Sequence, residues 1–466
     1  MYRNFHFIKV IGVIGFALIL LSCGVNQDAP PVSQVTQYPF NLEELQERTF
    51  NYFWDLADKD NYQIPDRYPT LTFSSIAATG FGLSSYLVGI EKGYITRESG
   101  AERTLQTLRA LMSLPQNKSE NEASGYHGFY YHFLSNDGAT RYKKVELSSV
   151  DTGLLMAGIL SVMSYFDGED NREVEIRKLA DTLYRRVNWN WMMTDNGLLS
   201  MGWKPESGFL DYYWEGYSEG MILYILALGS PTHSIPEDSW NNWTKSYRRE
   251  SFRGKSYVAY PALFTHQYTH IYVDFRGIKD EYMEEMGIDY FENSRRATYA
   301  NRDYCIRNPK SCKGYGANCW GLTACDGPPY QRTTIEGKEW IFLGYAARGA
   351  SEQNTVDDGT IAPTAAGGSM PFAPEICKPA LAYMWNTYYR QLVGEYGFKD
   401  AFNLTWMNEM TGEKGWFDKD YLGIDQGAML LQIENYRSGL IWEMMKKNPY
   451  VVTGLKKAGF KGGWLQ

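Results

Sequence analysis

The chain has 466 residues, of which 44% are apolar, 15% aromatic and 21% charged, so it can bury a large core and is unlike a disordered chain or a small disulfide-stapled fold. It carries 46 Lys and Arg against 54 Asp and Glu, a formal charge of −8, with no long basic run after the extreme N-terminus. Nucleic acid is therefore a poor candidate partner, because phosphate binding needs a concentrated Lys/Arg surface. The 36 Tyr, 22 Phe and 14 Trp often stand in polar, Gly-containing segments. They indicate either a cleft that stacks on a flat ligand or amphipathic Tyr in the core.

Residues 1–22 have the pattern of an export signal. A cationic start precedes an apolar stretch at residues 11–21, which is shorter than the about 20 residues that a membrane-spanning helix needs. The stretch ends in Leu-Ser-Cys-Gly and resembles a bacterial lipoprotein signal, with Cys23 as the lipidated first residue of the mature chain; a plain secretory signal is the alternative. Residues 23–40 then form a flexible tether. We expect a lipoprotein of the Gram-negative cell envelope, periplasmic or on the outer surface, that contacts the membrane through its lipid alone.

From residue 41 onward the patterns predict helices and no strands. Amphipathic segments alternate with segments that are apolar nearly all round, which is typical of solvated outer helices and buried inner helices. The expected helices are one capped by Asn41 and others at 74–90, 102–114, 149–165, 173–187, 219–228, 261–274, 282–302, 340–348, 374–394, 424–436 and 438–447. Such pairs predict an all-α fold, an (α/α)6 toroid that forms a single catalytic domain over residues 41–466. An open helical solenoid is the alternative, but it would show a fixed repeat period, and the sequence shows none.

In a toroid the loops that enter the inner helices converge at one end, and three apolar helices begin there with a carboxylate. Asp151 falls in a first turn behind Ser148 or Ser149 as N-cap, where the helix dipole favours an ionised carboxylate. Asp425 has the same place in a later helix. Asp151 is either a site residue or an ordinary first-turn charge, and for Asp425 a site role is favoured.

Glu215 and Glu219 lie four residues apart where the helix 219–228 begins. On one face of a helix, mutual repulsion and a partly apolar setting would raise at least one pKa, as a general acid near neutral pH requires. Trp214 and Tyr217 flank the two carboxylates, and Glu219 leads directly into an apolar helix. An exposed acidic helix start is therefore the weaker interpretation.

His266 and His270 have the i, i+4 spacing of a metal-binding helix, with Asp274 nearby. No Glu stands between them as in the zinc motif HEXXH, and no third ligand is evident, so no metal is expected. Hydroxyl recognition by His266, Gln267 and Tyr268 is the more natural interpretation.

The segment that contains Trp320 and continues through residues 326–330 predicts an aromatic loop suited to stacking on a sugar face. The chain has no G-x-S-x-G, P-loop or dinucleotide motif, and no cofactor is expected. Once Cys23 is lipidated, the remaining cysteines are Cys305, Cys312, Cys319, Cys325 and Cys377. Export permits disulfides, so local bridges or free thiols are expected rather than metal binding.

Three segments together resemble one protein family. They are residues 217–231, 267–276 and 425–439, which read YSEGMILYILALGSP, QYTHIYVDFR and DQGAMLLQIENYRSG. They are similar to the bacterial glucoamylase-like family, whose characterised members include the β-1,2-glucanases of glycoside hydrolase family 144. The resemblance spans roughly residues 40–460. It implies an (α/α)6 toroid that hydrolyses a β-glucan, above all a β-1,2-linked one, by an inverting mechanism without a cofactor.

Carried over position by position, the resemblance makes Glu219 the general acid. Asp151 and Asp425 compete for the role of general base, and Glu215 is close enough in sequence to tune Glu219. The implied substrate-binding set is Trp214, Tyr217, His266, Gln267, Tyr268, Trp320 and Glu146. The chain is expected to act as a monomer on an oligo- or polysaccharide.

Two other functions fit the sequence less well. A helical glycan-binding lipoprotein that feeds an outer-membrane importer would share the anchor, helices and aromatics, but it does not need carboxylates at three inner-helix starts. A polysaccharide lyase on the same fold needs a Tyr or His base and a positive group for a uronate, and the charge of −8 makes an acidic substrate less attractive.

Overall fold

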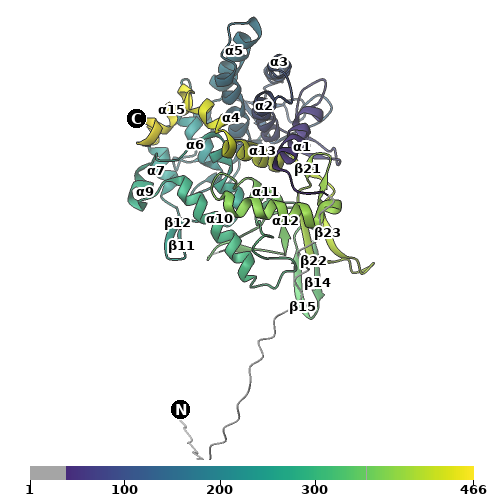
Figure 1. The fold of residues 1–466 in the computed structure, drawn as a ribbon. Helices are drawn as coiled ribbons and strands as arrows, with labels where there is room; N and C mark the ends of the chain where they lie inside the picture. The colour runs from purple at the N-terminus through teal and green to yellow at the C-terminus, as the bar shows by residue number, and fades with distance from the viewer. Residues whose placement is uncertain (1–37, 353) are drawn as a thin grey trace, which may run out of the picture. The chain divides into compact units, whose positions relative to one another are not determined.

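Four apolar helices form the centre of the fold: α2 (Ile76–Glu91), α4 (Ser149–Tyr165), α6 (Gly220–Gly229) and α13 (Gly423–Arg437). The computed structural model describes residues 38–352 and 354–466 (Figure 1). Helix α2 packs along α4, α4 also contacts α6, and α13 lies against α2. The backbones of α2 and α4 come very close, because a Cβ on Gly158 would lie 2.1 Å from the carbonyl oxygen of Gly80. Glycine at these two positions therefore permits the close packing of the two helices.

Amphipathic helices cover this centre. Helix α1 (Leu42–Asp55) packs on α2 and α13, while α3 (Arg97–Ser113) and α5 (Asn171–Arg185) pack on each other and cover α2 and α4. Asn41 caps α1 as predicted, since its Oδ1 accepts a hydrogen bond from the Glu43 amide at 2.9 Å. The other α-helices of the described residues are α7 (Asp238–Thr244), α8 (Tyr268–Tyr272), α9 (Glu281–Met286), α10 (Tyr290–Arg307), α11 (Pro363–Gly367), α12 (Pro374–Leu392), α14 (Leu440–Lys446) and α15 (Pro449–Lys457).

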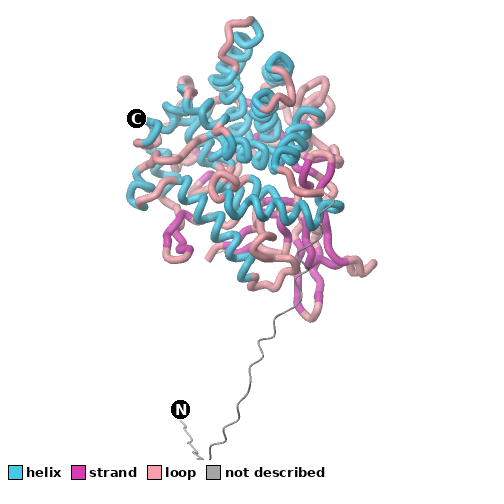
Figure 2. Tube along the Cα trace, in the orientation of Figure 1, coloured by secondary structure: helices cyan, strands magenta, loops and turns pink. Residues whose placement is uncertain are grey.

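Short antiparallel strands occur along the loops, so the prediction of helices without strands is wrong. Figure 2 shows these strands gathered mainly below the helices. The largest sheet has the order β3 (Gly125–Tyr126), β4 (Phe129–Tyr131), β6 (Leu147–Ser148), β8 (Gly202–Lys204) and β9 (Gly208–Phe209). A second has the order β19 (Thr360–Ile361), β22 (Phe402–Met407) and β23 (Lys414–Phe417). Pairs are formed by β1 (Arg67–Tyr68) with β24 (Tyr421–Leu422), β2 (Ser74–Ser75) with β5 (Phe133–Leu134), β7 (Leu199–Ser200) with β10 (Tyr213–Trp214), β11 (Arg249–Phe252) with β12 (Lys255–Val258), β13 (Ala324–Cys325) with β16 (Ala346–Ala347), β14 (Gln331–Ile335) with β15 (Lys338–Phe342), β17 (Gly349–Ala350) with β18 (Thr355–Val356), and β20 (Val393–Gly394) with β21 (Gly397–Phe398).

The helix predicted at 340–348 is instead part of the β14–β15 hairpin and of β16. The hairpin turn has positive φ at both Glu336 (52°) and Gly337 (78°), as two-residue hairpin turns often require. In β15 the rings of Trp340 and Phe342 are buried and stack with their centroids 6.1 Å apart. A spacing of two between buried aromatics is the period of a strand, and the sequence prediction assigned it the wrong period.

The helix predicted at 261–274 is broken at Gln267 into a 3-10 turn, η2 (Leu263–His266), and the short helix α8. At the break, Gln267 has a φ of −119°. Its side-chain amide donates to the carbonyl of Ala365 at 2.9 Å and to the hydroxyl of Ser369 at 2.8 Å. The break thus coincides with contacts to a segment far away in the sequence.

Residues Tyr38–Gln466 form one compact unit. Among the described residues, no helix has both the length and the apolar character that crossing a bilayer requires. The predicted signal at 1–22, the lipidated Cys23 and the tether up to residue 37 lie outside the described residues.

Candidate active site

Glu219 stands directly before α6, a helix whose ten residues are all buried. The residue is partly exposed, while its Oε2 atom is buried and has no hydrogen-bond partner among the residues described. Burial, opposed by a backbone hydrogen bond and assisted by the charge of Asp151, raises the pKa of Glu219 to about 7. A carboxyl group with this pKa keeps a proton close to neutral pH and can donate it to a reacting oxygen.

Glu215 does not share a helical face with Glu219, contrary to the expectation. Helix α6 begins only after Glu219, and Gly216 turns the chain between them with a φ of +70°. Glu215 is exposed and lines a cavity of about 480 Å³ together with Tyr260. Burial and the charge of Glu219 raise the pKa of Tyr260 to about 12. Glu215, Gly216 and Tyr217 all line this cavity, so its wall includes the chain segment that leads to Glu219.

Asp151 lies in the first turn of α4 and is held by two neighbours. Ser148, the N-cap, donates its hydroxyl hydrogen to Asp151 Oδ2 at 2.5 Å. His132 lies with Nε2 3.5 Å from Asp151 Oδ2 and with Nδ1 2.8 Å from Glu146 Oε1. Burial lowers the pKa of His132, but the charges of Asp151 and Glu146 outweigh it and raise the pKa to about 9. His132 is thus a cation at neutral pH, and Glu146, expected to bind substrate, forms an ion pair with it.

Asp425 lies in the first turn of α13 beside Asp400, and each of the two residues is only 4% exposed. Asp400 Oδ2 accepts a hydrogen bond from the Asp326 amide at 2.7 Å. Asp400 Oδ1 and Asp425 Oδ2 are buried, with no hydrogen-bond donor within the described part of the chain. Burial raises the pKa of Asp425 to about 7, and burial with the charge of Asp425 raises the pKa of Asp400 well above its usual value. A single proton held between the two carboxyl groups would satisfy both oxygens.

Five further charged groups surround this pair. Arg67 binds Asp66 (Nε to Oδ2, 3.2 Å) and Asp326 (Nη1 to Oδ2, 2.7 Å). Asp326, Asp418 and Asp420 place carboxylate oxygens within 4.8 Å of one another. Burial and the neighbouring carboxylates raise the pKa of Asp418 to about 8. Such oxygens suit a hard divalent cation, and they suit equally the donor hydroxyls of a sugar.

The hydroxyl of Tyr268 connects these groups. It is buried and has no hydrogen-bond partner in the described residues. Burial raises its pKa well above the usual value, and the charges of Asp425, Glu219 and Asp400 add to the effect. The hydroxyl therefore lies within electrostatic range of Glu219 and of Asp425 at the same time. Helix α8, which begins at Tyr268, contacts both α6 and α13.

Three of the expected substrate-binding side chains lie inside the protein. Trp320 is fully buried in a core cluster with residues of α11 and α12, so its ring offers no face to a sugar, contrary to the prediction. The Gln267 amide donates to a backbone carbonyl and a serine hydroxyl of residues 365–369 at 2.9 and 2.8 Å. His266 Nε2 lies 3.2 Å from the Tyr260 carbonyl, and burial lowers the pKa of His266 to about 4, so the ring is neutral.

Trp214 and Tyr217 lie at the entrance to α6. Trp214 is 8% exposed and donates from Nε1 to Ser149 Oγ at 2.9 Å, which ties the start of α6 to α4. Tyr217 is buried and also contributes to the wall of the cavity. The sequence reasoning missed Tyr345, which is 53% exposed and within electrostatic range of Asp425.

The remaining motifs are structural. All five cysteines after Cys23 are free and buried, so free thiols are found rather than bridges. His270 Nε2 bonds to Ser294 Oγ at 2.9 Å, and Asp274 forms an ion pair with Arg276 at 2.7 Å. These side chains do not converge on a common metal position.

Residues 211–449, just over half of the chain, match the Glycoamylase family model, described as "Putative glucoamylase". The chain is 31% identical over 477 residues to an exo β-1,2-glucooligosaccharide sophorohydrolase (non-reducing end) of Parabacteroides distasonis, which covers 93% of this chain. It spans only 60% of that relative's length. The solved structures similar to this chain include a "putative glucoamylase" from Bacteroides uniformis, with a TM-score of 0.79, 34% identity and coverage of 91% of this chain and 98% of that one. They also include an endo-β-1,2-glucanase from Chitinophaga pinensis with sophorotriose and glucose, with a TM-score of 0.77, 31% identity and coverage of 91% and 98%. The chain belongs to the Glycoamylase family of glucoamylase-like proteins.

Proposed function

We propose that this protein hydrolyses β-1,2-linked glucans, with Glu219 as general acid and the Asp425–Asp400 pair as general base. The observation that carries the proposal is helix α8, which begins at Tyr268 and contacts both α6, which follows Glu219, and α13, which carries Asp425. It joins a carboxyl that keeps its proton near neutral pH to a carboxyl pair that can accept one. The relatives named as a sophorohydrolase and an endo-β-1,2-glucanase support the substrate class.

The reaction is a single displacement. Water attacks the anomeric carbon from the face opposite the leaving oxygen, and its proton passes to the ionised oxygen of the Asp425–Asp400 pair. The bond between the anomeric carbon and the leaving oxygen breaks, and Glu219 gives its proton to that oxygen. The new reducing end has the inverted anomeric configuration.

Of the two candidate bases, the geometry favours Asp425 over Asp151. Asp151 Oδ2 accepts a hydrogen bond from Ser148 and faces the cationic His132. Asp425 instead lies beside Asp400, and a pair of carboxyl groups that shares one proton keeps one negative charge that can accept the proton of water. Asp151 then acts as a fixed negative charge that helps Glu219 to keep its proton.

The cavity next to Tyr260 suits the leaving part of the glucan. A general acid lies beside the leaving oxygen, so sugars on the leaving side must lie near Glu219. The wall of the cavity combines the ring of Tyr217 with polar side chains that include Glu250 and Asn354. Aromatic faces and hydrogen-bonding groups together are what a pyranose ring requires.

We infer that the helix pairs close into an (α/α)6 toroid with the starts of α4, α6 and α13 at one end. The buried inner helices, their amphipathic partners and the similarity to glucoamylase-like structures support this arrangement. The common position of Asp151, Glu219 and Asp425 at helix starts is the arrangement that such a toroid brings together.

We propose further that Cys23 is lipidated and holds the protein, as a monomer, on the cell envelope. The pattern of residues 1–22 supports this location. Full-length protein should fractionate with membranes and incorporate labelled palmitate, and Cys23→Ser should release it without label. Equal membrane association and label in both forms would contradict lipidation at this residue.

A product profile tests the function. Residues 24–466 are incubated with β-1,2-, β-1,3-, β-1,4- and α-1,4-glucans, the products are separated by chromatography, and the anomer first formed is followed by NMR. We expect cleavage of the β-1,2-glucan alone, with the α-anomer formed first. Glu219→Gln should abolish cleavage, whereas Glu169→Gln, at an exposed position in the loop before α5, should retain it. Binding of all substrates without turnover would overturn the proposal and favour a glycan-capture lipoprotein.

A further inference from the structure

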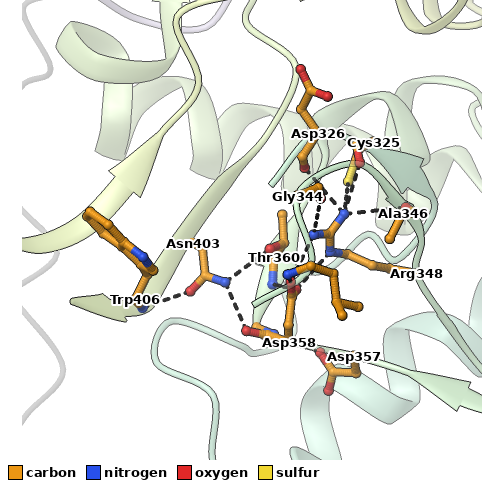
Figure 3. A network of polar contacts seen from close by, with 12 residues as sticks. Cys325, Asp326, Gly344, Ala346, Arg348, Asp357, Asp358, Thr360, Asn403 and Trp406 are labelled. Atoms are coloured by element: carbon orange, nitrogen blue, oxygen red, sulfur yellow. Dashed lines mark hydrogen bonds and ion pairs between the residues drawn. The ribbon is translucent and has the colours of Figure 1, made fainter. Parts of the chain in front are cut away.

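Arg348 lies between β16 and β17 and is fully buried. Its guanidinium donates hydrogen bonds to several segments of the surrounding loops. Figure 3 shows the guanidinium between Asp358 on one side and the carbonyl groups of Cys325 and Gly344 on the other. Its Nε and Nη2 bind the two oxygens of Asp358 at 2.7 and 2.8 Å. Nη1 donates to the Cys325 carbonyl at 2.9 Å, and Nη2 donates to the Gly344 carbonyl at 2.7 Å.

The chain leaves a space for this guanidinium next to Asp326. A Cβ on Gly327 would lie 2.0 Å from Arg348 Nη2 and 2.7 Å from the Gly344 carbonyl oxygen. Only glycine at position 327 permits this approach. The loop that carries Asp326 is thus built around the Arg348 side chain.

One peptide group connects Arg348 to the proposed base. The carbonyl of Cys325 and the amide of Asp326 belong to the same planar peptide unit. The carbonyl accepts from Arg348 at 2.9 Å, and the amide donates to Asp400 Oδ2 at 2.7 Å. A cation on the carbonyl side polarises the peptide, which strengthens the amide as a donor, and burial keeps water from weakening either bond.

We propose that Arg348 is a positioning residue of the reaction: through the Cys325–Asp326 peptide it orients Asp400, and so fixes the carboxyl pair that Asp400 forms with Asp425. This inference rests on the proposed function. Asp400 Oδ2 is held by the peptide, so Asp400 Oδ1 remains for the proton shared with Asp425. Rotation of the peptide would release Asp400 and leave Asp425 without an oriented partner.

The arrangement goes beyond what stability requires. A buried Arg–Asp pair costs desolvation, and apolar residues of similar volume often replace such a pair without loss of stability. Asp358 also accepts hydrogen bonds from the amides of Leu343 and Thr360 at 3.1 and 3.2 Å. Asp358 thus has partners besides Arg348, and the Cys325 residue whose carbonyl Arg348 binds also pairs with Ala346 in the β13–β16 ladder.

The pair has a defined charged environment, which makes its titration a suitable readout. Asp326, Asp418, Asp66 and the Arg67 guanidinium act on Asp400 and Asp425, as do the hydroxyls of Tyr268 and Tyr345. The Asp326 amide lowers the pKa of Asp400, so losing the oriented peptide raises the pKa of the pair. The base must be ionised to act, so the acid limb of the pH profile of kcat then moves to higher pH. The alkaline limb, which the pKa of Glu219 sets, stays in place.

The experiment compares Arg348→Lys and Arg348→Met with two controls in the whole mature chain, using β-1,2-glucan as substrate. Lysine keeps the charge but lacks the fork that serves Asp358 and Cys325 together. We expect kcat to fall by roughly 100-fold for both variants, as for a misplaced reacting group, with KM changed less than about threefold and the acid limb shifted upward. Asp358→Asn should lower the melting temperature but leave the acid limb in place, because Arg348 still reaches the Cys325 carbonyl. Cys377→Ala, which removes a buried free thiol on α12, should keep the wild-type pH profile of kcat.

Three outcomes would overturn the inference: a wild-type kcat profile in Arg348→Lys, an equal shift of the acid limb in Asp358→Asn, or a loss of kcat that follows melting temperature alone across the four variants. If Arg348→Met is insoluble, Arg348→Lys decides. Asp425→Asn separates this inference from the proposed function. If that variant keeps wild-type activity, the assignment of the base fails; if it is inactive while Arg348→Lys is normal, only the role of Arg348 fails.

Discussion

His132 lies with its Nε2 atom 3.5 Å from Asp151 Oδ2, so a cationic imidazole faces the first turn of α4. The folded pKa of His132, about 9, exceeds the value of about 6.5 for an unfolded histidine. Its ion pairs therefore stabilise the fold fully below about pH 6.5, and this contribution is lost as the pH rises through 9. We expect His132→Gln to lower the free energy of unfolding by about 1–2 kcal/mol at pH 6 and by much less at pH 10.

Urea unfolding of both proteins at the two pH values measures this difference. His233→Gln is the matched control, because His233 forms no ion pair with any residue that the structure describes. A destabilisation by His132→Gln that is equal at pH 6 and pH 10 would show that the imidazole is neutral in the folded protein.

The charge of Asp151 helps Glu219 to hold its proton, although burial is the larger cause. A general acid must be protonated, so kcat should fall above about pH 7 in the wild type. Asp151→Asn removes the assisting charge and lowers the pKa of Glu219, so the alkaline limb of the profile should move to lower pH. Initial rates from pH 5 to 9 measure the shift. An alkaline limb that stays in place would mean that Asp151 does not act on the acid.

Asp425→Asn removes the oxygen that accepts the proton of water. We expect kcat to fall by about 1,000-fold, within the range for loss of a general base, while the fold is retained. Azide, a small anion that needs no base, should restore part of the rate and yield a glucosyl azide of inverted configuration. Asp151→Asn should not respond to azide, and a response in that variant instead of Asp425→Asn would exchange the two roles.

The close approach of α2 and α4 gives a prediction about stability. A Cβ on Gly158 would lie 2.1 Å from the Gly80 carbonyl oxygen, so Gly158→Ala forces the helices apart and should cost about 3 kcal/mol or more. On the same helix, the nearest atom to a Cβ at Gly153 is 3.6 Å away, on Leu223. Gly153→Ala should therefore stabilise by roughly 0.5–1 kcal/mol through helix propensity. Equal effects of the two substitutions in urea titrations would contradict the packing described here.

The starts of the inner helices were predictable, because each couples a local cap to a long apolar pattern. Ser148 caps α4 and places Asp151 in its first turn, as the sequence indicates. Asp400 has no such signal: it stands in a loop between β21 and β22, and only tertiary folding brings it to Asp425. His132 likewise lies between two short strands with no motif of its own.

Errors in the prediction have the same origin. Trp320 stands in a Gly-rich segment that looks like a surface loop, yet the loop folds inward and buries the ring. Glu215 and Glu219 have helical spacing, but Gly216 takes a positive φ and ends that register. Local spacing predicts the elements that local interactions determine, and the path of a long loop depends on partners far away in the sequence.

The cavity beside Tyr260 gives the last prediction. Ser246 lines this cavity opposite Gly216, and a Cβ at Gly216 would lie 3.1 Å from Ser246 Oγ. Ser246→Trp should fill part of the space that the leaving sugars occupy. We expect KM for long β-1,2-glucan to rise about tenfold while kcat for the shortest cleavable oligosaccharide changes little, because uniform binding is lost and the reacting groups are not. Ser251→Trp, at an exposed position on β11, is the control. The cavity lies outside the path of the substrate if Ser246→Trp and Ser251→Trp give the same KM across chain lengths in initial-rate measurements.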